Sequence, residues 1–420
     1  MRRIRAALAG PAGVILPFLL VLPLTASYAT FGQVTGSLGG ATAQKLALVA
    51  AIIISAILLG VRIPPLPVWI MAGAVAAGYV LGLITGARDV AGFDSEMLFG
   101  AAGLIYPWLV FFIDWRRLDR FWRLVPLACS ALLTIVVALI LIACGDDTVA
   151  IMRPEYTGAV RLSAGLPPAF LAGLGLLGLI ASLWMWSLGR ATGIYLAVIN
   201  LGIVALTGTR MATAISAVSF LVFLVVGFLS RYPHRIIAVI MTAVGVIGGV
   251  FLVLPNFIQR YRGSAEGTGL LNASGRDQAW AYFMKKIAER PLTGYGPGSG
   301  PLLAANSGNP VIAKNFLSPH NNYITLTLDL GAVLAIVFLS ALVALAVMLV
   351  RGSHGSQRWL ASVLFAGAAV YALIDNLLTA AQAAILFATL LAYLWTDTTS
   401  LPPASLPAGA LRSDYRRRRR

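Results

Sequence analysis

Residues 194–229 read IYLAVINLGIVALTGTRMATAISAVSFLVFLVVGFL, a nearly continuous apolar run that the turn TGTR interrupts at residues 207–210. A membrane span takes about 20 residues, because a helix rises about 1.5 Å per residue and the hydrocarbon core is about 30 Å thick. The run is therefore too long for one span and suits two. Arg210 would lie at the membrane surface, either with a function or simply reaching the lipid headgroups.

The composition of the whole chain agrees with a membrane protein. Of its 420 residues, 59% are hydrophobic and 11% are charged, whereas a soluble domain has about 25% charged residues. Similar apolar runs recur along the chain, and we predict an all-α polytopic membrane protein with twelve transmembrane helices. The predicted spans are residues 12–30, 45–61, 67–85, 97–113, 124–144, 168–187, 192–208, 211–229, 236–254, 322–349, 359–376 and 380–396.

These spans divide the chain into four parts. Residues 1–254 hold nine predicted helices, 255–321 form one large loop, 322–396 hold three more helices, and 397–420 form a basic tail. The first span resembles a signal peptide, but an uncleaved helix makes the number of spans even and places both termini on one side. The five arginines that end the tail are expected to contact anionic headgroups.

The distribution of positive charge predicts the orientation of these spans. The chain has 31 Lys and Arg against 15 Asp and Glu, and cytoplasmic loops of membrane proteins carry an excess of basic residues. Alternate loops carry most of this excess if both termini are cytoplasmic, so we expect membrane lipids and no nucleic acid as partners. Two outer loops break the pattern: 145–168 holds Arg153 and Arg161, and 255–321 holds seven basic residues. The positive charge of these two outer loops is not explained by membrane orientation and indicates another role.

The centre of the large loop predicts a helix from about Arg276 to Arg290. Ser274 and Asp277 fit a helix N-cap, and Pro291 ends the helix. At 100° per residue, the face that carries Arg276 is otherwise apolar, with Ala279, Trp280, Phe283, Met284 and Ile287. An arginine on such a face needs an anionic partner, and the free N–H groups of the first turn favour an anion as well. A diphosphate would suit this position, whereas an ion pair with Asp277, Glu266 or Glu289 is the structural alternative.

Two segments follow this helix. Residues 291–300 read PLTGYGPGSG, and glycines this dense allow either close approach of a ligand or tight turns. Residues 318–323 read SPHNNY and place His320 at the outer mouth of a membrane helix. An imidazole, with an ordinary pKa of about 6.5, suits a base that accepts a proton from a sugar hydroxyl. A purely structural role at the start of the helix is the alternative for His320.

These features together resemble the O-antigen ligase and O-antigen polymerase superfamily. They are Arg210 after a turn of small residues, Arg276 at the head of a loop helix that Pro-Leu-x-Gly-x-Gly follows, and Pro-His-Asn before a membrane helix. The resemblance runs from about residue 206 to residue 331. It implies a membrane glycosyltransferase of the bacterial inner membrane whose active site faces the periplasm.

The motif of the ligase members is His-Asn, nine residues, then Gly-x-x-Gly. His320, Asn321 and Gly331 match this motif, and Leu334 stands where the last glycine is expected. The O-antigen ligase is the function that we expect from this resemblance, and a polymerase is the alternative.

The resemblance also assigns roles to residues of this chain. Arg210 and Arg276 would hold the diphosphate of an undecaprenyl-linked glycan, and His320 would act as base on the acceptor hydroxyl. Further contacts to the diphosphate or the glycan are expected from Arg260, Arg262, Tyr295, Asn321 and Tyr323. The diphosphate carries its own activation and arginines can stabilise its charge, so we expect no cofactor, no metal and no ATP.

Two other functions remain open at this stage. The expected ligase transfers the glycan to the lipid A core oligosaccharide during lipopolysaccharide biosynthesis, whereas an O-antigen or exopolysaccharide polymerase joins one lipid-linked repeat to another. A glycolipid transporter or flippase is the alternative from a different class. Transporters place charged residues near the bilayer midplane, whereas the polar residues here gather at one face. The enzyme is therefore favoured.

Overall fold

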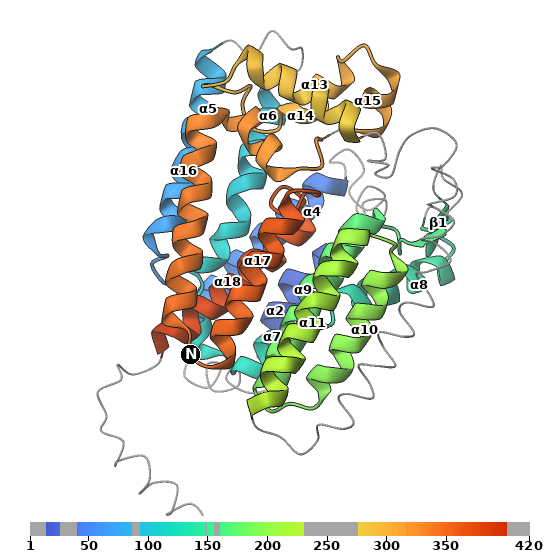
Figure 1. Cartoon of the computed structure of the whole chain (residues 1–420), viewed down its shortest axis with the longest axis vertical. Coiled ribbons are helices and arrows are strands. Elements are labelled where there is room, and N and C mark those ends of the chain that lie inside the picture. Colours follow the sequence, from blue (N-terminus) through green and yellow to red (C-terminus); the bar gives the residue numbers. More distant parts are fainter. Residues whose placement is uncertain are drawn as a thin grey trace, which may run out of the picture.

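A computed structural model describes the protein over residues 14–25, 40–85, 93–147, 149–154, 160–230, 276–316 and 318–400. Most of these residues are helical, and the long helices form a bundle with a layer of short helices at one end (Figure 1). The expected features that lie outside the described residues are the span 236–254, Ser274, Arg260, Arg262, Glu266 and the tail beyond residue 400.

The N-terminal part forms helices close to the predicted spans. In chain order these are α2 (Ile15–Thr25), α4 (Gly40–Leu59), α5 (Leu66–Ile84), α6 (Phe93–Ile105), the 3-10 helices η4 (Tyr106–Phe112) and η5 (Trp115–Arg117), α7 (Arg120–Ala128), α8 (Ser130–Ala143), α9 (Pro168–Ser187), α10 (Thr192–Leu206) and α11 (Arg210–Ser230). The span predicted at 124–144 is a bent pair, because α7 and α8 meet at an angle of 49°. Pro126 removes a backbone donor just before this bend.

The C-terminal part adds the short helices and three long ones. They are α13 (Arg276–Glu289), α14 (Ser299–Ala305), α15 (Pro310–Asn315), α16 (Asn322–Gly352), α17 (Ser356–Ala372) and α18 (Ala381–Ser400). We call α13, α14 and α15 the cap, and the two ends of the bundle the cap end and the base end. An antiparallel ribbon that the sequence does not predict, β1 (Met152–Pro154) with β2 (Val160–Leu162), lies between α8 and α9.

The helices are apolar enough for a membrane protein. Among the described residues, α5, α9 and α16 are each long and apolar enough to cross a membrane, and the bent pair α7–α8 would make a fourth span. Several others, including α10 and the first part of α11, are apolar but shorter. The number of twelve spans therefore stays a prediction.

Helix α9 is the centre of the bundle. Every residue from Leu171 to Met185 is buried, because other helices surround α9 on all sides. Glycines bring α10 close to it: a Cβ at Gly175 would lie 2.6 Å from Val204, and a Cβ at Gly193 would lie 2.5 Å from the Ser182 carbonyl oxygen. Side chains larger than glycine would push these two helices apart.

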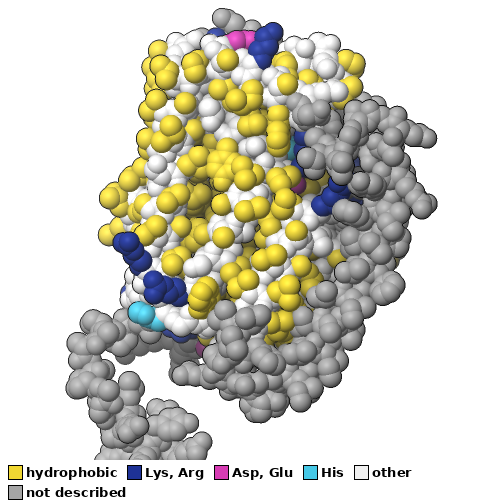
Figure 2. Space-filling view, in the orientation of Figure 1, with side chains coloured by type: hydrophobic (Ala, Val, Ile, Leu, Met, Phe, Trp, Pro, Cys, Tyr) yellow, Lys and Arg dark blue, Asp and Glu magenta, His cyan; other side chains and the backbone are white. Residues whose placement is uncertain are grey.

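The outside of the bundle is apolar where a bilayer would surround it. Figure 2 shows hydrophobic side chains over the middle of one face, with basic side chains gathered near the ends and at the border of the undescribed part. Along α16, for example, Val333, Ile336 and Val343 are exposed. In water such a surface would be unfavourable, whereas lipid tails accept it.

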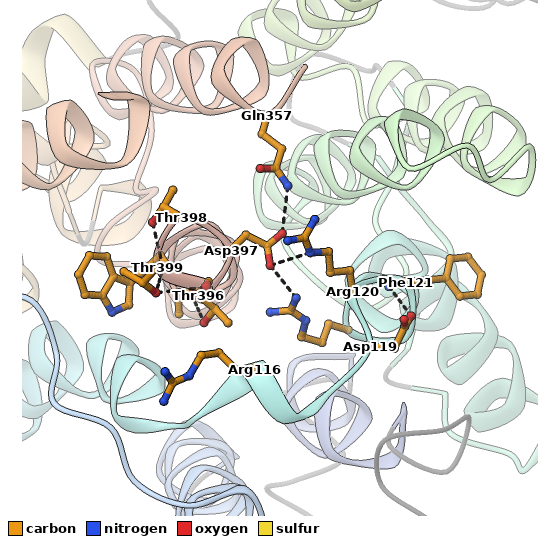
Figure 3. Close-up of polar contacts among 12 residues, drawn as sticks. Arg116, Asp119, Arg120, Phe121, Gln357, Thr396, Asp397, Thr398 and Thr399 are labelled. Atoms are coloured by element: carbon orange, nitrogen blue, oxygen red, sulfur yellow. Dashed lines mark hydrogen bonds and ion pairs between the residues drawn. The ribbon is translucent and has the colours of Figure 1, made fainter. Parts of the chain in front are cut away.

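A buried ionic cluster holds the base end together (Figure 3). The Asp397 carboxylate accepts hydrogen bonds from Arg123 at 2.8 Å and Gln357 at 3.0 Å, and Arg120 lies 3.2 Å away. These contacts hold the last turn of α18 in place. The helix therefore continues to Ser400, beyond the predicted start of the tail at residue 397.

Candidate active site

Helix α13 begins at Arg276, as the sequence predicts, and it uses the predicted apolar face. Ala279 and Phe283 are fully buried, and Ile287 is partly buried. Met284, expected at the edge of this face, is exposed instead. The apolar face packs on a small core of the cap that is formed with Tyr295, Leu303, Ala304, Ile312, Phe316 and Leu328.

The glycine-rich segment after α13 docks on a break in α16. The Tyr295 N–H donates to the Leu328 carbonyl oxygen at 2.8 Å, and the Gly296 N–H donates to that of Asp329 at 2.9 Å. Gly331 has a φ of +76° at this break, and a Cβ there would lie 2.1 Å from the Leu292 carbonyl oxygen. The glycine of the motif is therefore required by close contact between two backbones.

Helix packing also explains the other glycines of this segment. The buried Asp329 carboxylate accepts from the Gly298 N–H at 3.1 Å and from the Ser299 hydroxyl at 2.8 Å. A Cβ at Gly100 of α6 would lie 2.6 Å from Gly298. Close backbone contact accounts for Gly294, where a Cβ would lie 2.5 Å from the Gly331 nitrogen, and positive φ values of +96° and +82° account for Gly296 and Gly298.

Tyr295 interacts with two residues at the end of α13. Its hydroxyl donates to Glu289 at 2.9 Å, and the Arg290 guanidinium lies 5.0 Å from the centre of its ring. Burial, followed by the hydrogen bond to Glu289, raises the pKa of Tyr295 to about 12. The hydrogen bonds from Lys286 and Tyr295 lower the pKa of Glu289. The role of Tyr295 in glycan binding stays a prediction.

Arg276 reaches from the cap into the bundle. Its Nη1 donates to the Ile374 carbonyl oxygen at 2.6 Å, in the segment 373–380 between α17 and α18, which we call the α17–α18 turn. Glu289, one of the carboxylates considered as an ion-pair partner of Arg276, pairs with Lys286 at 2.9 Å instead. The side chain of Asp277 lies outside the described part of the structure.

His320 contacts the same turn. Its Nδ1 lies 3.6 Å from Oδ1 of Asp375, whose side chain is 4% exposed. At 3.6 Å the two groups form an electrostatic contact rather than a hydrogen bond, and Nδ1 has no hydrogen-bond partner among the described residues. Burial would raise the pKa of Asp375, but His320, the Asn376 N–H and the charge of Arg276 together hold it below its ordinary value of 3.8. The carboxylate is therefore ionised at neutral pH.

The backbone conformation at His320 is strained. His320 has a φ of +50°, a conformation that is uncommon for residues other than glycine. The Trp280 indole N–H donates to the carbonyl oxygen of the preceding Pro319 at 2.7 Å, and the Phe316 ring stands edge-on to the imidazole. Such strain persists only where neighbours enforce it, and it is frequent at functional sites.

The asparagines around His320 fix the segment 318–323 on the α17–α18 turn. Asn321 is the N-cap of α16 and accepts from the Tyr323 N–H at 2.9 Å. Asn322 accepts from the Leu378 N–H at 3.0 Å, and Asn376 donates to the Ser318 hydroxyl at 2.7 Å. The predicted contact residue Tyr323 donates from its hydroxyl to the Ala369 carbonyl oxygen at 3.1 Å.

Arg210 approaches this turn along α11. Ile215 packs on Gly367 of α17, where a Cβ would lie 2.9 Å from the isoleucine. Helices α11 and α17 are antiparallel, because the start of α11 and the end of α17 both lie at the cap end (Figure 1). Arg210 precedes Ile215 by five residues, and Ala372 follows Gly367 by five residues, so both lie about 7.5 Å closer to the cap end. Arg210 is therefore level with the start of the α17–α18 turn. Its side chain is exposed.

Two of the three predicted catalytic residues, Arg276 and His320, thus contact one turn that the sequence alone does not identify. Arg276 binds this turn directly, His320 lies beside its Asp375, and Arg210 lies level with its start. Asp375 had been placed inside the span predicted at 359–376. A carboxylate within a predicted span was the signal that could have identified it. Among the described residues, no group of three or more His, Cys, Asp or Glu is arranged to hold a metal ion.

Comparison with known proteins agrees with the resemblance. Residues 195–339 match the family model described as O-Antigen ligase, and this range includes Arg210, Arg276 and His320. No curated protein matches the chain. Members of this family are membrane-embedded ligases and polymerases that act on lipid-linked glycans. Residues 195–339 are therefore similar to the O-Antigen ligase family, which supports the resemblance to the O-antigen ligase and polymerase superfamily.

Proposed function

We propose that the protein is an O-antigen ligase of the bacterial inner membrane. It transfers a glycan from undecaprenyl diphosphate to the lipid A core oligosaccharide, with the cap end facing the periplasm and both termini in the cytoplasm. The observation that supports this proposal most strongly is the convergence of Arg276, His320 and Asp375 at the α17–α18 turn. Neither ATP nor a metal ion is required.

The arginines supply the charge that the donor needs. When the bond between the sugar and the diphosphate breaks, negative charge grows on the leaving diphosphate, and guanidinium groups stabilise it with paired hydrogen bonds. Arg276 is oriented for this role by the Ile374 carbonyl oxygen, which leaves the positive charge of the guanidinium in place. Arg210 contributes the second charge.

His320 accepts the proton of the acceptor. A carboxylate at Nδ1 favours the imidazole tautomer with its proton on Nδ1, so Nε2 is the basic atom, and Asp375 is placed for this. The acceptor hydroxyl oxygen bonds to the anomeric carbon, its proton moves to His320, and the bond to the diphosphate breaks. Direct displacement inverts the anomeric configuration, and a retained configuration in the product would contradict this step.

The test is transfer of glycan from a purified undecaprenyl diphosphate donor to lipid A core. We expect the parent protein to form the product and the variants Arg276→Ala and His320→Ala to lose at least about 100-fold in rate. Lys285→Ala is the matched control for Arg276, since Lys285 is exposed on the same helix. His354→Ala, an exposed histidine at the base end, is the control for His320.

The same assay separates the alternatives. Growth of the glycan when the donor is supplied alone, without transfer to lipid A core, would assign the protein as a polymerase. Failure of both reactions with folded protein would instead favour the glycolipid transporter, which a flipping assay in vesicles then tests.

A further inference from the structure

The ribbon β1–β2 brings two arginines together at the cap end. Its register pairs Arg153 directly with Arg161. Like charges directly opposite one another destabilise an antiparallel pair. Positive charge is also disfavoured in outer loops of a membrane protein. The position of Arg161 therefore needs a compensating interaction.

Arg161 contacts the turn that precedes Arg210. Its Nε donates to the Thr207 carbonyl oxygen, and its Nη2 donates to the Thr209 hydroxyl at 2.8 Å. The Thr207 hydroxyl donates in turn to the Thr209 hydroxyl at 3.1 Å. One planar guanidinium thus bridges the two residues on either side of Gly208, and the second of these residues directly precedes Arg210.

Arg161 also lies in the same electrostatic neighbourhood as the candidate active site. The charges of Asp375, Arg276 and Arg161 all act on the Tyr371 hydroxyl at the end of α17. That hydroxyl donates to the Ala169 carbonyl oxygen at 3.0 Å, near the start of α9. Helices α11 and α17, which adjoin the turn at residues 207–209 and the α17–α18 turn, pack on each other through Ile215 and Gly367.

We propose that Arg161 is a positioning residue of the diphosphate site, which fixes the turn at residues 207–209 so that Arg210 faces the donor diphosphate. This inference rests on the proposed function. The positioning role requires the two-pronged guanidinium group, because its Nε and Nη2 donate to two acceptors that lie in different directions. The single ammonium group of lysine cannot reproduce this geometry.

The experiment measures binding of undecaprenyl diphosphate and glycan transfer in the full chain, reconstituted in lipid. For Arg161→Ala we expect the affinity for undecaprenyl diphosphate and the donor kcat/KM to fall about 10-fold or more, with the acceptor KM unchanged. Arg153→Ala is the matched control, because Arg153 is exposed, carries the same charge and is paired with Arg161 in the ribbon. It should bind like the parent.

Two further variants separate positioning from charge. Arg161→Lys keeps the charge and loses the fork, and it should bind the diphosphate as weakly as Arg161→Ala. In an Arg210→Ala background, Arg161→Ala should weaken binding by less than about 2-fold, because residues that act through one another are not additive. Full rescue by lysine, or an additive loss in that background, would overturn the inference.

The outcomes also distinguish this inference from the proposed function. If Arg276→Ala and His320→Ala abolish transfer while Arg161→Ala binds the donor like Arg153→Ala, only the role of Arg161 fails. If the parent transfers no glycan to any acceptor but binds undecaprenyl diphosphate in a manner that depends on Arg161 and Arg210, the ligase assignment fails and the positioning role stands. An equal loss of donor and acceptor binding with a lowered Tm would show a merely structural role and overturn the inference.

Discussion

Arginines gather at both ends of the bundle, and the two groups differ in what holds them. At the base end, Arg123 and Arg120 lie 2.8 Å and 3.2 Å from the buried Asp397 carboxylate. At the cap end, Arg276 donates to the uncharged carbonyl oxygen of Ile374 at 2.6 Å. A carboxylate orients a guanidinium and neutralises it, whereas a carbonyl oxygen orients it and leaves its charge for a ligand.

This difference teaches how to read arginines in a membrane protein. Both groups lie near the ends of apolar helices, so their place in the sequence does not separate a structural cluster from a binding site. The hydrogen-bond acceptor of each guanidinium group, a carboxylate or a carbonyl oxygen, does separate the structural cluster from the candidate binding site. The base-end cluster locks α7 to α18, whereas Arg276 forms its hydrogen bond with a carbonyl oxygen, and the charge of Asp375 acts on it without an ion pair among the described residues.

Breaking the base-end cluster should have the largest effect on stability. Asp397→Ala leaves Arg123 buried without its carboxylate, which costs about 3–5 kcal/mol in free energy of unfolding. Thermal denaturation in detergent should show a markedly lower Tm, while the affinity of the folded protein for undecaprenyl diphosphate is retained. Replacing both partners with apolar residues, Arg123→Met with Asp397→Leu, should recover much of the loss. An unchanged Tm for Asp397→Ala would refute the locking role.

The corresponding change at the cap end should affect the reaction instead. Asp375→Asn keeps the shape of the side chain but removes the charge that orients His320, and kcat should fall about 100-fold. The Tm should fall far less than in Asp397→Ala. Steady-state transfer kinetics check this prediction, and a kcat within 2-fold of the parent would show that Asp375 does not serve His320.

A smaller effect is expected for Tyr295. Tyr295→Phe removes the hydrogen bond to Glu289 and should cost about 1 kcal/mol in stability with little change in transfer. Because the pKa of Tyr295 is raised to about 12, the hydroxyl is protonated at every pH at which transfer is measured. If Tyr295→Phe instead raises the KM for the donor 10-fold, the predicted glycan contact is supported.

The smallest effect concerns acid pH. Because the pKa of Asp375 is lowered in the folded protein, its carboxylate stabilises the fold fully above the ordinary value of 3.8, and this contribution is lost as the pH falls through the lowered value. The Tm difference between the parent and Asp375→Asn should shrink as the pH falls below 3.8. A difference that grows on acidification would contradict the direction of the shift.

The helices were predictable from the sequence because apolar runs and their polar breaks report them directly. The predicted span 168–187 coincides with α9, and the loop helix begins at the predicted Arg276. The ribbon β1–β2 was not predictable, since three-residue strands carry too little pattern. The bend between α7 and α8 has one signal in the sequence, Pro126, although the apolar run continues through it.

The candidate site was predictable only in part. The sequence singled out Arg276 and His320 by residue type and position, whereas Asp375 was hidden in an apolar run and its role depends on contacts between distant segments. The glycines of residues 291–300 were open to two readings, and only the docking on α16 separated them. Close contact with α16 explains Gly294, and a left-handed backbone explains Gly296 and Gly298.

The most direct test of the account compares one arginine from each end. Glycan transfer from an undecaprenyl diphosphate donor to lipid A core is measured for Arg276→Ala and for Arg120→Ala, whose arginine pairs with Asp397 at the base end. The account predicts that Arg276→Ala loses at least about 100-fold in transfer rate at an unchanged Tm, while Arg120→Ala keeps nearly full activity. Equal activity of the two variants would contradict the assignment of the cap-end arginines to the diphosphate.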